Sequence, residues 1–165
     1  MRELYKLEVK KEKERKPEEY MVCIVIFDNE TRNFRGFANK VTQVSFNAKI
    51  YVSGFFDRKM NRLTLLEVGK GKFKKPTLYI FKNINETGDF RIYDNEYRFM
   101  YSKPTGRASI KIEEILEEEK AVNLEKDISD FLAVIDSQKD IDAKRVGGIN
   151  LSEIEADLRY YNYFL

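Results

Sequence analysis

Apolar and polar side chains alternate along residues 41–55, VTQVSFNAKIYVSGF. This period of two is typical of a β-strand with one buried face. At roughly 3.3 Å per residue, the first dozen residues would span about 40 Å, about twice the length of an ordinary strand. We therefore expect a strand that bends across two sheets or around a barrel, with Gly54 as the place for such a bend.

Other strand patterns surround this segment, and no helical pattern separates them. An apolar run, YMVCIVIF, occupies residues 20–27, and residues 62–68 are expected to return antiparallel to the long strand after a polar turn. Further patterns lie near 77–84 and 107–112. The sequence therefore predicts a mainly β body of five to seven strands, either a small antiparallel barrel that is OB-like or a sandwich.

The charge of the chain changes sign along its length. Residues 20–112 carry 17 basic and 8 acidic side chains, a net charge of +9, whereas residues 113–165 carry 6 basic and 14 acidic ones, a net charge of −8. In the acidic part, helical spacing replaces alternation and produces apolar stripes. We predict a charged segment with an edge strand at 1–19, a basic β domain at 20–112, and two or three acidic helices at 113–165 that dock on something. The stripes are formed by Leu124, Ile128, Phe131, Leu132 and Ile135, and by Ile154, Leu158, Tyr161 and Leu165.

The composition excludes several kinds of chemistry. The chain contains no histidine, which removes Ser-His-Asp catalysis, Cys-His catalysis and zinc sites that depend on histidine. Its single cysteine, Cys23, can form no internal disulfide, which indicates a reducing, intracellular (cytoplasmic) setting, including that of a virus-infected host cell. No apolar run approaches the roughly 18 residues that cross a bilayer. We expect no membrane contact and no cofactor.

The basic body also holds ten of the twelve phenylalanines and six of the ten tyrosines. Proteins that bind single-stranded nucleic acid combine cations for the phosphates with aromatic faces on which bases stack. The polar members of the long strand should face outward, beside a hairpin partner and the lysine-rich segment GKGKFKKP at 69–76. The predicted nucleic-acid-binding residues are Lys49, Tyr51, Arg62, Lys70, Lys72, Phe73, Lys74 and Lys75. The competing explanation is that the aromatic residues build the core and the lysines keep the surface soluble.

Two known families offer partial similarities. Residues 35–38, RGFA, match the opening of the RNP1 motif of RNA-recognition motifs, but the match ends at Asn39 and Lys40, and there is no room for the helix that should precede it. The succession of a basic, aromatic β body and an acidic segment ending in YYNYFL resembles viral single-stranded DNA-binding proteins. This resemblance covers charge layout only, and it implies a viral or phage protein that binds single-stranded DNA. The chain departs from it because its acidic segment has the stripes of ordered helices.

The leading prediction is non-catalytic, sequence-tolerant binding of nucleic acid, single-stranded more than duplex. A second hypothesis is a structural or assembly protein, such as a phage or viral particle component, whose C-terminal helices contact a second copy or another protein. A third is a metal-dependent nuclease built from Asp57, Glu67 and Lys70, whose spacing is not distinctive.

Overall fold

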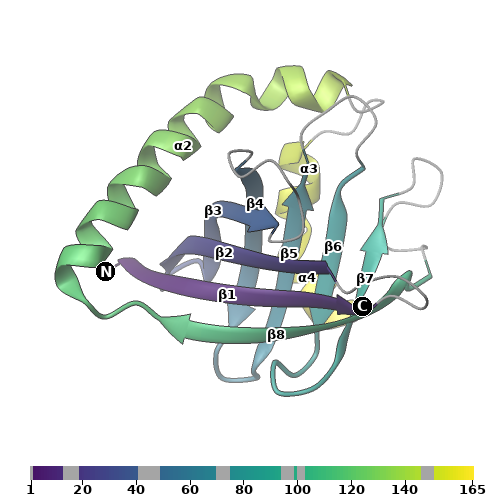
Figure 1. Cartoon of the computed structure of the whole chain (residues 1–165). Helices are drawn as coiled ribbons and strands as arrows, with labels where there is room; N and C mark the ends of the chain where they lie inside the picture. Colours follow the sequence, from purple (N-terminus) through teal and green to yellow (C-terminus); the bar gives the residue numbers. More distant parts are fainter. Residues whose placement is uncertain are drawn as a thin grey trace.

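The computed structural model describes residues 2–12, 19–40, 49–69, 75–93, 99, 103–145 and 151–165. Eight antiparallel strands form a closed barrel in which the strand order follows the sequence (Figure 1). Three described helices follow. The strands are β1 (Arg2–Glu12), β2 (Glu19–Asp28), β3 (Asn33–Lys40), β4 (Ile50–Asp57), β5 (Arg62–Val68), β6 (Thr77–Phe81), β7 (Gly88–Ile92) and β8 (Gly106–Glu114), and the helices are α2 (Glu118–Arg145), α3 (Leu151–Ala156) and α4 (Leu158–Phe164).

The predicted antiparallel barrel with C-terminal helices is confirmed, but the prediction of five to seven strands is wrong, because β1 joins the barrel and eight strands form it. Two further details differ. β1 pairs with β2 on one side and with β8 on the other, so it closes the barrel and is not an edge strand (Figure 1). The charged residues that follow Val9 suggest an exposed edge, but Leu7 and Val9 belong to the interior of the barrel. The strands also run up and down in sequence order, which is not the Greek-key order of an OB-type barrel.

The inward-facing side chains fill the barrel. Alternate residues of β2, from Met21 to Phe27, are buried, and the residues between them are half-buried. An eight-stranded barrel is just wide enough for its own side chains to occupy the interior. The interior is an apolar core whose bulkiest members are Phe27, Phe34, Phe81, Phe90 and Tyr79.

The long strand of the sequence is described from Ile50 onward as β4, and residues 41–48 lie outside the described residues. The described part follows the predicted alternation, because Ile50 and Val52 belong to the interior and Tyr51 packs on the outside. A side chain at Gly54 would begin 2.1 Å from the Phe34 ring and 2.3 Å from the Thr64 carbonyl oxygen. Glycine at this position therefore makes room for that ring.

The helices pack on the outer surface of the barrel. Leu151, Ile154, Leu158 and Tyr161 of α3 and α4 join a second apolar cluster with residues of β4, β5 and β6. Ile128 of α2 packs with Leu4 and Phe37. The predicted docking stripes are thus confirmed, and the surface that they dock on is the barrel itself. In the part of the chain that the structure describes, no helix combines the length and apolar character needed to cross a membrane.

Candidate nucleic-acid interface

Four side chains on the outward side of β3 and β4 come closest to the predicted binding site. Phe37 and Tyr51 lie directly opposite each other in the register of the two strands. The Arg35 guanidinium lies 5.5 Å from the centre of the Tyr51 ring, and the Lys49 ammonium lies 4.3 Å from the centre of the Phe37 ring. Both distances are within the range of cation–π interactions. We call this set of cations and rings, Arg35, Phe37, Lys49 and Tyr51, the β3–β4 face.

The C-terminal helices cover the β3–β4 face with groups of matching chemistry. The Asp136 carboxylate of α2 forms a two-contact ion pair with Arg35, in which one N–O distance is 3.3 Å. The Tyr51 hydroxyl accepts a hydrogen bond from Arg35 Nε at 3.0 Å and donates one to Glu155 Oε2 of α3 at 2.6 Å. The Phe131 ring of α2 meets Phe37 edge to face, with centroids 5.8 Å apart.

Tyr51 points outward as predicted, but it is covered, since only 2% of its surface is accessible. Alternation along β4 predicted the outward direction of this side chain, but it contains no information about which helix lies over it. Burial, followed by the Glu155 carboxylate, raises the pKa of Tyr51 above its ordinary value. The hydroxyl therefore remains protonated and can donate to Glu155 at neutral pH.

The other predicted site residues are distributed over the barrel. Lys75 is exposed just before β6, whereas Arg62 begins β5 at the opposite end of the barrel. At about 3.4 Å per residue, the length of β5 separates Arg62 from the lysine-rich segment by about 20 Å. The remaining predicted residues, Lys70, Lys72, Phe73 and Lys74, lie outside the described residues.

Sequence reasoning missed Arg35 and Phe37 as members of the site, although a signal was present. Phe34 and Ala38 belong to the interior, so alternation along FRGFAN places Arg35 and Phe37 outward. These two residues also lie in RGFA, which is similar to the opening of RNP1, but the chain does not have the fold of an RNA-recognition motif. The structure brings them together with Lys49 and Tyr51.

Charge is distributed unequally between the two ends of the barrel. We define the basic end as the end at which β1, β3, β5 and β7 finish, and we count the two terminal residues of each strand with the described connections. The basic end carries seven basic and three acidic side chains, a net charge of +4, and the opposite end carries six basic and nine acidic ones, a net charge of −3. The seven basic residues are Lys11, Lys40, Lys49, Lys75, Arg91, Lys103 and Arg107.

Two of these cations take part in a polar ring just inside the basic end. Tyr79 donates a hydrogen bond to one oxygen of the Glu67 carboxylate at 3.1 Å, and Lys40 lies 3.3 Å from the other oxygen. Glu19 contacts both Lys40 and Lys11, at 3.9 and 3.5 Å. These partners neutralise the two lysines, so the side chains best placed to meet an external anion are the exposed Lys75, Lys103 and Arg107.

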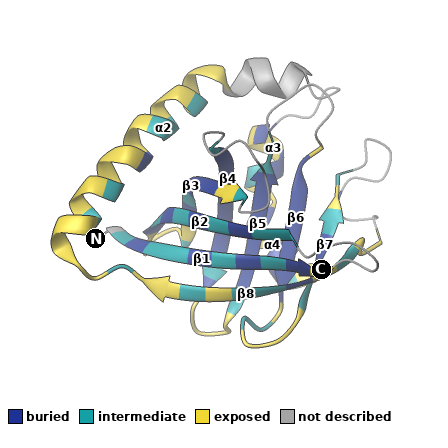
Figure 2. Ribbon diagram, in the orientation of Figure 1, coloured by how far each residue is buried: buried dark blue, intermediate teal, exposed yellow. Residues whose placement is uncertain are grey.

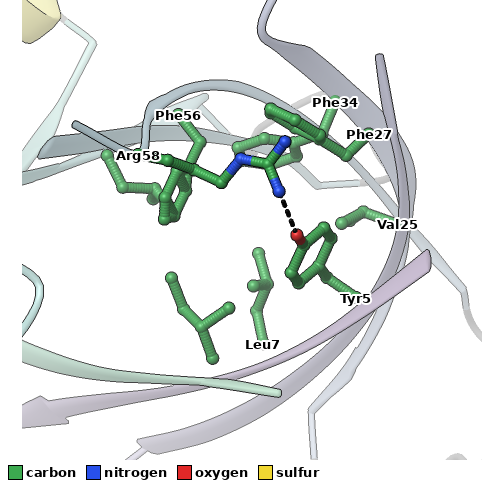
Figure 3. A pocket seen from close by; sticks show the side chains of 9 residues that line it. Tyr5, Leu7, Val25, Phe27, Phe34, Phe56 and Arg58 are labelled. Carbon is green, nitrogen blue, oxygen red and sulfur yellow. Dashed lines mark hydrogen bonds between the residues drawn. The ribbon is translucent and has the colours of Figure 1, made fainter. Parts of the chain in front are cut away.

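A small apolar pocket opens toward the opposite end of the barrel (Figure 3). Arg58 lies across it, donates hydrogen bonds to Tyr5 at 3.0 Å and to Glu3 at 2.9 Å, and stacks 4.9 Å above Phe27. The volume of the pocket, about 10 Å³, is roughly that needed by one water molecule. This pocket cannot hold a substrate or a lipid.

The residues of the nuclease hypothesis do not come together. Asp57 ends β4 at the opposite end, whereas Glu67 lies in the polar ring of the basic end, about 17 Å away along β5. Lys70 lies outside the described residues. Among the residues with described positions, no group of three or more acidic or cysteine side chains is arranged to hold a metal ion. Burial raises the pKa of the Cys23 thiol, which makes it a poor nucleophile.

Comparisons of the chain with protein-family models, with curated proteins and with solved structures find no match. The geometry of the barrel and its charges must therefore supply the functional argument.

Proposed function

We propose that this protein binds nucleic acid without catalysis and that the polyanion is held at the basic end of the barrel. The observation that carries the proposal is the unequal charge of the two ends, +4 against −3. Phosphates bind wherever cations gather without enough acidic partners. The same end joins β5 to β6, and the sequence of that connection, GKGKFKKP, adds further lysines. Binding through phosphates alone tolerates any base sequence.

Charge reversal at the basic end, compared with charge reversal away from it, tests the proposal. The variant Lys75→Glu/Lys103→Glu/Arg107→Glu changes three exposed cations of the basic end. The matched control, Lys59→Glu/Lys82→Glu/Lys111→Glu, makes the same change of charge at exposed positions away from the basic end. Fluorescence polarisation with labelled single-stranded and duplex oligonucleotides at two salt concentrations measures the affinity of each variant.

We expect the basic-end variant to lose at least tenfold in affinity. The slope of log affinity against log salt concentration should be smaller in magnitude by about 2, which corresponds to three lost contacts to single-stranded phosphates. The control should stay close to the wild type. The absence of wild-type binding at low salt, or equal losses in both variants, would contradict the proposal.

A second candidate function, assembly of copies of this chain, is favoured by one specific observation. Tyr160 and Phe164 of α4 stack on each other with centroids 4.7 Å apart, yet Phe164 is 71% exposed. Exposed stacked rings are typical of protein contact surfaces. Light scattering of the wild type and of Phe164→Ser tests this function. A wild-type oligomer that becomes monomeric in the variant supports it, and a monomeric wild type excludes self-association.

A further inference from the structure

The β3–β4 face combines the two kinds of group that single-stranded nucleic acid requires. The Phe37 and Tyr51 rings lie side by side across the two strands, and each is paired with a cation. Rings of this kind stack with bases, and cations of this kind hold phosphates. The face is also continuous with the basic end, because Lys49 belongs to both.

The groups that cover this face resemble those of the proposed ligand. The Asp136 carboxylate forms an ion pair with the Arg35 guanidinium, and the Glu155 carboxylate accepts a hydrogen bond from the Tyr51 hydroxyl. One ring, from Phe131, meets Phe37 edge to face and covers it. The helices therefore satisfy the face with anions and an aromatic ring, as a nucleic acid strand would.

The attachment of α2 is narrow. Within residues 118–138, for which side-chain burial is described, Ile128 is the only buried residue, and the other residues of its apolar stripe are half-buried (Figure 2). The ion pair between Arg35 and Asp136 is accessible to solvent, with side-chain exposures of 33% and 53%. Exposed ion pairs contribute little to stability and are screened by salt. In Figure 1, α2 curves around the outside of the barrel as a single layer.

We infer that α2 is a displaceable acidic cover, and that single-stranded nucleic acid bound at the basic end extends onto the β3–β4 face by replacing Asp136 and Phe131. This inference rests on the proposed function and adds a way in which nucleic-acid binding is regulated. The full chain then binds more weakly than its exposed face would, and loosening the cover strengthens binding.

A pair of isosteric variants of the full chain tests the cover. The latch variant, Asp136→Asn, neutralises the carboxylate with which α2 holds Arg35. The control, Asp130→Asn, removes the same charge from an exposed position on the same helix. Polarisation of a labelled single-stranded oligonucleotide gives the affinities, and hydrogen–deuterium exchange of α2 reports its detachment without reference to affinity.

We expect the latch variant to bind at least about fivefold more tightly than the control, within the usual range of coupling between sites. Adding Lys49→Gln should cost the latch variant more affinity than it costs the wild type, because in the wild type α2 still covers the face beside Lys49. Nucleic acid should also increase amide exchange in α2 of the wild type. Equal affinities of the latch variant and the control, together with unchanged exchange, would overturn the cover while leaving binding at the basic end intact. Failure of every variant to bind would overturn the proposed function itself.

Discussion

The two sides of strand β3 are held in different ways. On the inward side, Phe34 and Ala38 belong to the apolar interior of the barrel and have no polar contacts to exchange. On the outward side, Arg35 and Phe37 are held by a carboxylate and a ring from α2, more than ninety residues later in the chain. An apolar core loses its contacts only when the barrel opens, whereas charged contacts can be replaced by water or by another anion. One strand can therefore support the fold on one side and an exchangeable contact on the other.

The largest effect is expected on the inward side. Phe34→Ala should lower the free energy of unfolding by about 3 to 5 kcal/mol, because it leaves a cavity in a closed interior. Urea denaturation measures the loss. Phe164→Ala, at an exposed position on α4, is the matched control and should change stability by less than about 0.5 kcal/mol. A similar effect of the two substitutions would show that the interior is not close-packed.

The bond between Tyr51 and Glu155 should give the next largest effect. Tyr51→Phe removes a buried hydrogen bond to a charged group, which should lower the free energy of unfolding by about 1.5 to 3 kcal/mol. A double-mutant cycle with Glu155→Gln, measured by urea denaturation, separates this bond from other effects of each substitution. Additive losses within about 0.5 kcal/mol would mean that the two groups do not interact.

A pH-dependent effect is expected where α4 meets the barrel. The Tyr163 hydroxyl donates a hydrogen bond to the Asp57 carboxylate, and this bond, assisted by the Met60 amide and by Arg32, lowers the pKa of Asp57. A lowered folded-state pKa stabilises the fold above the unfolded value of about 3.9, and the stabilisation is lost as the pH falls through the folded-state value. The wild type should therefore lose more stability than Asp57→Asn between about pH 4 and pH 2. Parallel losses in thermal melts would contradict this assignment.

The smallest effect is expected for the exposed ion pair. Asp136→Asn should lower the free energy of unfolding by about 0.2 to 1 kcal/mol. Salt screens exposed charges, so the difference from the wild type should shrink between low salt and about 0.5 M. A larger loss that does not depend on salt would indicate that Asp136 holds α2 by more than its charge.

Much of the fold could be predicted because alternation reports burial on one side of each strand. The directions of Ile50, Tyr51 and Val52, and the docking stripes of the C-terminal helices, followed from this local pattern. The closure of β1 on β8 could not be predicted, because no local pattern specifies which strand lies beside the first one.

The candidate site was predicted less completely, for a related reason. The exposure of Tyr51 depends on Glu155, which is 104 positions away in the sequence. Arg62 begins β5, the strand that pairs with β4, and the lysine-rich segment follows β5. They lie at opposite ends of β5, however, and are therefore far apart. The unequal charge of the barrel ends arises only when eight separate strand ends are assembled.

The closure of the barrel also fixes the order in which the chain can fold during synthesis. Leu7 lies opposite Cys23 on one side and opposite Ile112 on the other. β1 leaves the ribosome well before β8 and must wait for it before the barrel can close, and contacts between such distant residues slow folding. The helices emerge later still, so we expect the β3–β4 face of a nascent chain to be formed before Asp136 and Glu155 can reach it.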